Sequence, residues 1–425
     1  MDRREASRNL IAVAIGVAGC SNSGPGTLAV AASSATAFFP VTPAETFANV
    51  PVSSIDTSIP PYRADRYGFS NAPGASGSAN ALALRYAVAA ATAAGARLKI
   101  PGGVAAATGV PASSPYGTPY PYTSSVVLEL TCDVEGDGVA STVIGCSGGK
   151  GGPGNYFVYF RLTDSKELRD LEIDNNGAIS DGTIGLHLSN SHQALPDSGS
   201  LYSRGEMRVT RIKLMGFATN IRAERTFLVT LDQVQSYKGG YGFYCQPDVT
   251  TPGDSGTAFV TTHVHLNCIY DGNSVNIFYQ TPVASYNVTF VNGASQNATS
   301  AFSANGASYS NYFSDISNLH FIDWYTESQP AAIVVTGCTV TFDGLWLGST
   351  GGIYLGTGVW ARFINVRSAS AAGSGTDNLV VASGGRQYVT MEGCIWADAT
   401  APAQIEHCVL LQTVINGNYT AFSAT

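Results

Sequence analysis

The sequence predicts an all-β protein, a parallel β-helix closed at one end by a helix. Short apolar strand segments recur along most of the chain, an Asn or Asp residue recurs within them, and one alanine-rich helical segment precedes them all. Successive strand segments start mostly about 20 to 30 residues apart, a period typical of solenoids. Because no helical segments lie between the strands, the pattern disfavours a βαβ fold.

The composition favours an extracellular β protein. The chain has 425 residues, of which 44% are hydrophobic, enough to bury a large core. Only 12% are charged, while 47 are glycine and 21 are tyrosine, a profile unlike that of cytosolic helical enzymes. A formal net charge of −8 without a cluster of Lys and Arg disfavours a nucleic-acid partner, because phosphate binding needs such a cluster.

Residues 1–37 have the pattern of an export signal, with a disordered N-terminus as the alternative. Three arginines precede an apolar run from Leu10 to Gly19 that is too short to span a bilayer. No other segment is apolar enough, so we expect no membrane span and a secreted, periplasmic or cell-surface protein. The eight cysteines show no CxxC pair and no zinc-ligand spacing, which predicts no structural metal site.

The folded part begins with an arm and a helix. Residues 38–65 are rich in proline and short polar residues, which predicts an extended arm. A helix over about 79–94 follows, with Gly95 at its end. The first coil of a β-helix exposes unpaired backbone groups, and an amphipathic helix across that end would cap them. The β-helix domain, including this capping helix, therefore spans residues 66–425.

A polar residue recurs after the apolar pair of most strand segments. Asn and Asp tolerate the left-handed backbone conformation of a tight turn. Stacked coils would bring these residues into a ladder with steps of about 4.8 Å. The predicted ladder residues are Asp232, Asn267, Asn292, Asp323, Asp343, Asn365, Glu392 and Asn416.

The start of the domain resembles a known family. The stretch DRYGFSNAPGASGSANALALRYAVAAATAAGARLKIPGG, residues 65–103, is similar to the N-terminal signature of the pectate-lyase-like superfamily, in the branch with rhamnogalacturonase-related proteins and phage tailspike depolymerases. Residues 133–145 and 168–177 resemble its early coils. The resemblance implies a single-stranded right-handed parallel β-helix that acts on an acidic or decorated polysaccharide. It implies no cofactor, except calcium if the enzyme is a lyase.

Three classes of function fit the sequence. The first is an exported polysaccharide-degrading enzyme, either a glycoside hydrolase or a polysaccharide lyase. The family's NTD, DD, GHG and WiDH motifs are absent, so its catalytic residues cannot be transferred. That absence favours the second class, a non-catalytic carbohydrate-binding or adhesion β-helix. The third is a phage-type tailspike that binds a receptor. A polysaccharide is the expected partner in each case, and the chain is a monomer or a homotrimer.

Candidate site residues follow from the acids and aromatic residues of the second half. Hydrolysis needs two carboxylates. Asp323 and Asp343 lie at equivalent places in consecutive coils, where their carboxylates can share a proton. They can also serve as turn residues of the ladder, and this turn role is favoured. Glu327 lies beyond the ladder position and is the sharper catalytic candidate, with a solvated edge residue as the alternative. The predicted sugar-stacking residues are Trp324, Tyr325 and Trp346.

Two further features have ordinary explanations. His263 and His265 alternate along one strand and face the same side. They have no third ligand, so polar residues on a strand face are favoured over a metal site. Residues 246–259 form a long segment between coils, which is typical of a loop that walls a binding groove.

Overall fold

The computed structural model describes one compact unit within Phe38–Thr425. The described residues are 38–72, 75–108, 125–147, 157–163, 165–175, 179, 182–189, 206–224, 226, 228–246, 261–299, 302–304, 307–327, 333–348, 352–368, 379–381, 388–396, 407–415 and 418–424. The predicted export signal, residues 1–37, lies outside them. Within the described ranges, no helix is both long enough and apolar enough to cross a bilayer.

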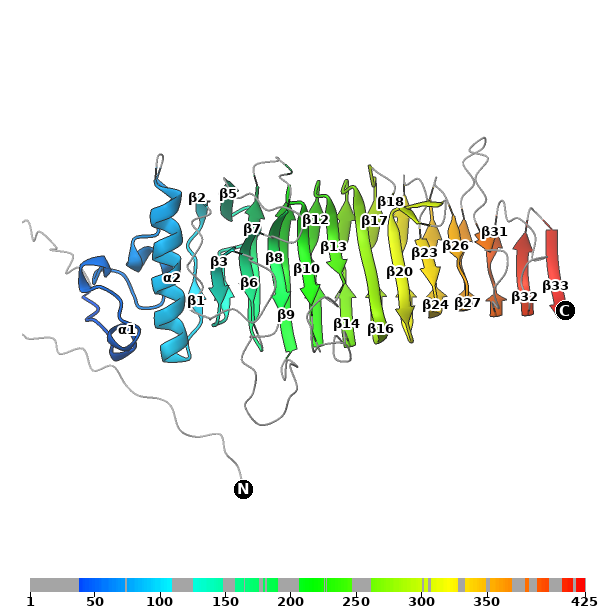
Figure 1. Cartoon of the computed structure of the whole chain (residues 1–425), viewed down its shortest axis with the longest axis horizontal. Helices are drawn as coiled ribbons and strands as arrows, with labels where there is room; N and C mark the ends of the chain where they lie inside the picture. The colour runs from blue at the N-terminus through cyan, green and yellow to red at the C-terminus, as the bar shows by residue number, and fades with distance from the viewer. Residues whose placement is uncertain are drawn as a thin grey trace, which may run out of the picture. The chain divides into compact units, whose positions relative to one another are not determined.

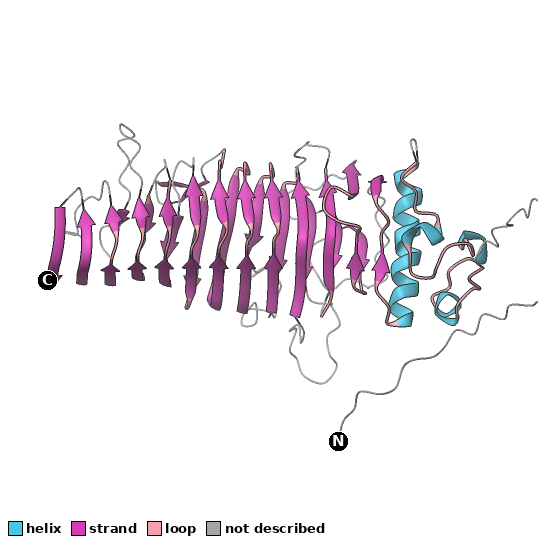
Figure 2. Ribbon diagram, turned by 180° about the vertical axis from the view of Figure 1, so that it is seen from behind, coloured by secondary structure: helices cyan, strands magenta, loops and turns pink. Residues whose placement is uncertain are grey.

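The strands form stacked coils, with the helices at one end of the stack (Figures 1 and 2). Nearly every strand pairs in parallel with its counterpart in the next coil. Parallel strands joined by crossovers wind in the right-handed sense. The predicted right-handed parallel β-helix is therefore confirmed. Each coil contributes to three sheets in turn.

Sheet 1 is the first that each coil enters. Its strands pair in parallel from one coil to the next. They are β3 (Ser125–Leu130), β6 (Phe157–Leu162), β8 (Thr183–Ser189), β10 (Thr219–Glu224), β13 (Tyr241–Cys245), the first part of β16 (Val275–Val291), β20 (Asn311–Ile316), β23 (Ile333–Thr336), β26 (Ile353–Leu355) and β29 (Leu379–Val381).

Sheet 2 follows in each coil and ends at a tight turn. The second part of β16 belongs to it. Its other strands are β1 (Leu98–Lys99), β4 (Val134–Glu135), β7 (Glu167–Asp174), β9 (Glu206–Met215), β11 (Leu228–Asp232), β14 (Thr261–Leu266), β21 (Leu319–Ile322), β24 (Thr339–Asp343), β27 (Trp360–Ile364), β30 (Tyr388–Glu392) and β32 (His407–Ile415).

Sheet 3 lies beyond the turn and is made of short strands. The last residues of β7, β9 and β32 extend into it. Its own strands are β2 (Gly103–Thr108), β5 (Thr142–Ser147), β12 (Gln235–Tyr237), β15 (Ile269–Asp271), β17 (Ala294–Gln296), β22 (Tyr325–Glu327), β25 (Trp346–Leu347), β28 (Arg367–Ser368) and β31 (Ile395–Trp396). A small hairpin, β18 (Phe302–Ala304) and β19 (Ala307–Tyr309), lies outside the three sheets.

Both ends of the stack depart from the parallel pattern. Helix α2 (Gly77–Ala94) lies at the N-terminal end, begins at the N-cap Ser76 and ends at Gly95, whose φ of 61° is left-handed. Its small buried residues join the same core as the first coils, which confirms the predicted helix and lengthens it by two residues. At the other end β33 (Asn418–Ala424) pairs antiparallel with β32.

The segment before α2 is folded and is not the expected extended arm. It contains α1 (Pro43–Phe47), η1 (Val52–Ser54) and, running past its predicted end, η2 (Ala64–Tyr67). The cause is a buried ion pair: Arg66 Nε lies 2.6 Å from Glu45 Oε1, and both side chains are fully buried. Tyr67 donates its hydroxyl hydrogen to the same carboxylate at 2.9 Å, so the segment wraps around this pair.

The turn ladder exists, with a one-residue correction. Asn267, Asn292, Asp323 and Asn365 have φ values of 50° to 53°, as the ladder prediction requires. In the other coils the left-handed residue is the one after the predicted acid. Asp232, Asp343 and Glu392 end their strands, and the turn positions are Gln233, Gly344 and Gly393. Glycine adopts positive φ without strain, so an acid–glycine pair moves the turn by one residue. The predicted ladder residue Asn416 lies outside the described residues.

Asparagine side chains inside the coils form hydrogen bonds with one another. Asn273 is fully buried. Its Nδ2 donates to the Ser236 carbonyl at 3.0 Å and to Asn276 Oδ1 at 2.9 Å. Its Oδ1 accepts from the Gly239 N–H at 2.8 Å and from Asn220 Nδ2 at 3.1 Å. This amide therefore links consecutive coils from the inside.

Replacing Asn273 with leucine of similar volume is expected to lower the free energy of unfolding by about 3 kcal/mol, because several buried groups lose their partner. Urea unfolding of both proteins measures the difference. Asn318→Leu is the control, since Asn318 is exposed and its loss should change stability by less than about 0.5 kcal/mol. Equal stability of wild type and Asn273→Leu would contradict the proposed role of the amide.

Candidate functional site

The two aspartates proposed to share a proton are not equivalent in the structure. Asp323 pairs in register with Gly344, whereas Asp343 pairs with Ile322. Asp323 is the left-handed turn residue of its coil, with a φ of 50°, and its carboxylate lies over Gly344, where an added Cβ would meet Oδ1 at 2.3 Å. The turn role of Asp323, which the sequence favoured, fits this position. A proton shared between Asp323 and Asp343 does not.

Glu327 lies on the outer side of β22 and its side chain is partly exposed. It is in register with Gln296 of the preceding coil. A hydrogen bond links its side chain to the Tyr325 hydroxyl, and this bond, with burial, raises the pKa of Tyr325 to about 12. No second carboxylate is in register with Glu327. In the preceding coil its neighbour is Gln296. In the following coil Leu347 pairs with Thr326, so the next residue, Gly348, lies opposite Glu327.

The three predicted stacking residues have different environments. Trp346 is 55% exposed and meets the ring of Tyr325 edge to face, with centroids 5.6 Å apart. Trp324 is 1% exposed and packs edge to face on Phe290 at 5.2 Å inside the coils. The stacking prediction for Trp324 is corrected, because a core ring cannot meet a sugar. Trp346 and Tyr325 lie on the surface.

His263 and His265 point into the core, and both are fully buried. They belong to a hydrogen-bonded chain: His263 Nδ1 meets the Tyr279 hydroxyl at 2.9 Å, the same hydroxyl meets His265 Nε2 at 2.8 Å, and His265 Nδ1 meets the Tyr270 hydroxyl at 2.6 Å. Burial lowers the pKa of His263 to about 3. The fourth ring nitrogen, His263 Nε2, meets the Thr226 hydroxyl at 2.6 Å. Each ring nitrogen therefore has a hydroxyl partner, so the histidines are internal polar groups rather than metal ligands.

A different row of residues carries charge on the outer face of sheet 1. Parallel register places one residue of each strand directly above its neighbour, and such neighbours lie about 4.8 Å apart. Alternate residues of the same strands belong to the main core, so this row faces away from it. We call it the sheet 1 row: Glu129, Arg161, His187, Arg222, Tyr244, Phe278, Tyr312, Val334 and Tyr354.

The first half of the sheet 1 row forms a buried ionic cluster with Glu224. Arg161, His187 and Arg222 are 7%, 6% and 5% exposed. Glu224 receives a charge-assisted hydrogen bond from Arg222 and lies 3.1 Å from His187 Nε2. Burial alone would raise the pKa of Glu224, but the charge of Arg222 and the hydrogen bond from His187 outweigh it and lower the pKa to about 2.

His187 is held as a neutral base. Burial lowers its pKa, against the opposing effect of Glu224, and the two neighbouring arginines lower it further. Because Glu224 is ionised, it accepts the hydrogen of Nε2, and the lone pair of the imidazole lies on Nδ1. Nδ1 is buried, and none of the described residues gives it a hydrogen-bond partner. Seven other buried polar atoms of the described residues share this property, but Nδ1 belongs to a histidine in register with two arginines, which suits an atom that meets an anionic ligand.

The N-terminal end of the sheet 1 row holds a second acid. Glu129 is in register with Arg161. Burial raises its pKa, and the charge of Arg161 opposes that rise. Glu129 and Glu224 therefore have pKa values displaced in opposite directions. They lie three coils apart along the stack, about 14 Å at 4.8 Å per coil, which is too far for the paired carboxylates of a glycosidase.

The second half of the sheet 1 row is aromatic. Tyr244 stacks on Phe278 with centroids 5.0 Å apart and an interplanar angle of 6°, and Phe278 stacks on Tyr312 at 5.2 Å. Arg222 lies over the ring of Tyr244, 5.3 Å from its centroid, and so joins the charged half to the aromatic half. These residues form a hydrophobic cluster separate from the main core.

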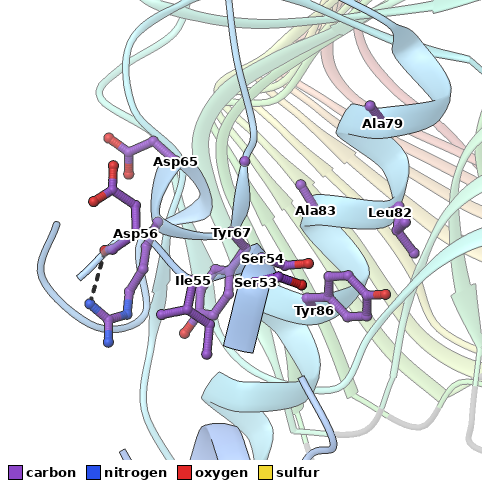
Figure 3. Close-up of a pocket in the computed structure, with 12 residues that line it drawn as sticks. Ser53, Ser54, Ile55, Asp56, Asp65, Tyr67, Ala79, Leu82, Ala83 and Tyr86 are labelled. Atoms are coloured by element: carbon purple, nitrogen blue, oxygen red, sulfur yellow. Dashed lines mark hydrogen bonds between the residues drawn. The ribbon is translucent and has the colours of Figure 1, made fainter. Parts of the chain in front are cut away.

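A cavity of about 460 Å³ lies beside α2. Figure 3 shows Leu82, Ala83 and Tyr86 of the helix facing Ile55 and Ser53 of the preceding segment. Its acidic groups are already engaged, since Asp65 pairs with Arg63 at 2.8 Å and Asp56 accepts two hydrogen bonds from Ser58. This cavity belongs to the cap and offers less chemistry than the sheet 1 row.

Metal-ligand geometry is absent from the described part of the chain, which contains no group of three or more His, Cys, Asp or Glu side chains that could hold an ion. The predicted loop at 246–259 lies almost entirely outside the described residues. Six buried cysteines, from Cys132 to Cys394, are free thiols.

Sequence reasoning missed the charged cluster. The alternation in "NIRAE", residues 220–224, places Arg222 and Glu224 on one face of a strand, and that signal was available. The alternation does not give the register between coils, which places His187 beside Arg222 and Arg161 beside His187.

Comparisons with known proteins support the fold. The A-module of mannuronan C-5 epimerase AlgE4 from Azotobacter vinelandii aligns with a TM-score of 0.56 and 14% identity, over 83% of this chain and 95% of that chain. The enzymatically active domain of tailspike protein 2 from bacteriophage CBA120 aligns with a TM-score of 0.55 and 12% identity, over 84% of this chain and 52% of that chain. No protein-family model matches the sequence, and no curated protein does.

These likenesses show the fold alone. The chain spans about half the length of the tailspike domain and most of the epimerase module. Both neighbours share the stacked parallel architecture at identities that carry no residue-by-residue correspondence.

Glu224→Gln is expected to lower the free energy of unfolding at pH 7 by about 3–5 kcal/mol, because the buried Arg222 loses its counter-charge. The pKa of Glu224 falls from its ordinary 4.5 to about 2 on folding. Its contribution is therefore complete above pH 4.5 and is lost as the pH falls toward 2. Urea unfolding between pH 7 and pH 3 should show the gap between the two proteins narrowing below pH 4.5.

The matched control is Glu392→Gln. Glu392 is 55% exposed and lies 3.8 Å from Arg362, so its loss should cost no more than about 1 kcal/mol at any pH. A gap for Glu224→Gln that stays constant with pH would show that the carboxylate is not ionised in the cluster.

Proposed function

We propose that the chain is a polysaccharide-modifying enzyme that abstracts a proton from the carbon next to the carboxylate of a uronic acid. The observation that supports this most directly is the buried Nδ1 of His187, which has no partner among the described residues. Glu224 holds this atom as an acceptor, and Arg161 and Arg222 flank the histidine in register. A base between two fixed cations suits a substrate that is an anion and becomes more negative during the reaction.

The residues divide into distinct roles. His187 Nδ1 takes the proton, and the electron pair of the broken C–H bond moves toward the carboxylate. Arg161 and Arg222 stabilise that charge as it develops. Glu224 is a positioning residue, because its bond to Nε2 fixes the tautomer and stabilises the imidazolium that forms.

Two outcomes follow from the same intermediate. In elimination, the bond from the adjacent carbon to the glycosidic oxygen breaks, a C=C bond forms, and the imidazolium returns its proton to the leaving oxygen. In epimerisation, solvent water supplies a proton to the original carbon from the opposite face, the imidazolium releases its proton to the solvent, and no bond of the chain breaks. Both outcomes begin at His187.

The aromatic half of the sheet 1 row suits the rest of the polymer. Tyr244, Phe278 and Tyr312 follow the charged cluster in consecutive coils. These rings stack face on face, so they would present their edges to a polymer lying along the row, whose reacting uronate would lie at His187. Nδ1 is buried, so binding requires that the groups covering it move away, which also excludes water from the reaction.

The structural neighbours give this proposal further support. One is named a mannuronan C-5 epimerase and the other an enzymatically active tailspike domain. A non-catalytic β-helix that binds a polysaccharide without changing it is the second candidate, favoured by the missing motifs of the sequence. Export to the periplasm or cell surface, a calcium requirement, and a monomeric or trimeric state remain proposals attached to this function.

Replacing His187 with alanine is expected to lower kcat on a uronate polymer by about 10²- to 10⁴-fold, the range of general base catalysis. The assay follows the ultraviolet absorbance of unsaturated uronate for elimination, and proton exchange at the ring carbon by NMR for epimerisation, on polymannuronate, polygalacturonate and hyaluronate. Because a base acts when unprotonated and the pKa of His187 is lowered, kcat/KM should fall only below pH 6.5.

His320→Ala is the control, since this histidine lies on sheet 2 and its Nε2 lies 2.6 Å from Asn318 Oδ1. Its activity should equal that of wild type. Unchanged activity of His187→Ala in a folded protein would remove the proposed base. Tight binding of a polymer with neither absorbance nor exchange would favour the non-catalytic binding β-helix.

A further inference from the structure

The outer face of sheet 3 carries a second row, remote in the coil from the sheet 1 row. Register places Tyr325, Trp346, Arg367 and Ile395 above one another in four consecutive coils. We call these four residues the Trp346 patch. Trp346 is 55% exposed and Ile395 is 45% exposed. Two large apolar side chains therefore face solvent, one in each of the coils next to that of Arg367.

The aromatic pair of the patch is held in place. Tyr325 and Trp346 meet edge to face at 77° with centroids 5.6 Å apart, so their planes do not cover each other and an indole face stays open. The Tyr325 hydroxyl is anchored by Glu327. A surface tryptophan fixed in this way offers a rigid stacking platform at low entropic cost.

Arg367 supplies the charge. It is exposed, and none of the carboxylates in the described ranges lies within ion-pair distance of it. Its register neighbour Trp346 lies one coil away, about 4.8 Å. A ring stacked on the indole therefore brings a carboxylate on that ring within reach of the guanidinium, which is a geometry suited to carboxylate recognition.

We propose that the Trp346 patch is a second, non-catalytic binding site for an acidic polysaccharide, with a sugar ring on Trp346 and its carboxylate on Arg367. The identity of this ligand rests on the proposed function, because the same polymer would reach His187 on sheet 1. Two sites on one polymer raise the effective concentration of the chain at the reacting site.

A second copy of the chain is a poorer occupant. A stable interface buries about 800 Å² on each partner. A fully exposed aromatic side chain contributes at most about 250 Å², and Trp346 is only about half exposed while Tyr325 is partly buried. The patch is too small for a subunit contact and large enough for one or two sugar rings.

The test measures binding apart from catalysis. Trp346→Ala and Arg367→Gln are made in a His187→Ala background, and the dissociation constants for long polygalacturonate, polymannuronate and hyaluronate are measured by affinity electrophoresis, with dextran as the neutral polymer. We expect each variant to bind a long polyuronate roughly fivefold to tenfold more weakly. With His187 intact, kcat/KM on short uronate oligosaccharides should stay unchanged.

Trp360→Ala is the matched control. Trp360 is 57% exposed but lies on sheet 2, where its ring packs on Tyr388 with centroids 4.2 Å apart. Its loss should leave polymer binding unchanged, and thermal unfolding of all variants verifies that they fold.

Several results would overturn the proposal. One is unchanged binding by Trp346→Ala, and another is an equal loss in Trp360→Ala. A change in mass by light scattering on mutating Trp346 would make the patch a subunit contact. An equal loss of dextran binding in Arg367→Gln would show that Arg367 does not recognise the carboxylate of the sugar. The proposal for the Trp346 patch alone would fail if the wild type processed short oligosaccharides and the patch variants bound the polymer as tightly as their parent. Both this proposal and the proposed function would fail if the wild type bound no polyuronate.

Discussion

Parallel pairing between coils is the constraint on which the rest of this structure depends. Each residue lies directly above its counterpart in the next coil, about 4.8 Å away, so a side chain always meets the side chain in register with it. Inside the coils this produces stacks of like residues, such as Phe321, Phe342 and Phe363, with centroids 5.1 Å and 5.0 Å apart. Outside, it produces rows, and both surfaces discussed above are such rows.

The same constraint explains why charge gathers on sheet 1. A lone buried charge on a strand face is costly, and a row gives each charge fixed neighbours. Arg161, His187 and Arg222 follow one another in consecutive coils, and Glu224 lies two residues beyond Arg222 on the same face. The carboxylate neutralises part of the cluster and selects the tautomer of His187. The two arginines of the cluster suit an anionic substrate more than a neutral one.

The sequence predicted those features that a single coil determines. Strand alternation, the capping helix and the asparagine turns depend on local residues, and they could be read directly. The ladder slipped by one residue at Asp343 because the glycine after it takes the left-handed conformation more easily. Trp324 and Trp346 look alike in sequence, but Trp324 follows the turn residue of its coil and points inward, while Trp346 begins a strand and points out.

The candidate site could not be predicted in the same way, because it depends on register between coils. His187 and Arg222 are 35 residues apart in number, and the segments between successive coils vary in length. Nothing in the spacing of the sequence fixes which residues of two coils become neighbours. Only the alternation of Arg222 and Glu224 on one strand is a local signal. It does not reveal His187, whose coil lies between the coils of Arg161 and Arg222.

The two ends of the stack have a consequence for how such a protein can change over time. Helix α2 closes one end and the antiparallel strand β33 lies against the last parallel strand at the other. Among the described residues, each strand of a coil between them pairs with strands of the coils next to it. Duplication or deletion of one whole coil would therefore preserve both ends and lengthen or shorten the sheet 1 row by one step, so that evolution could adjust the number of sugar rings that the surface holds without redesigning the fold.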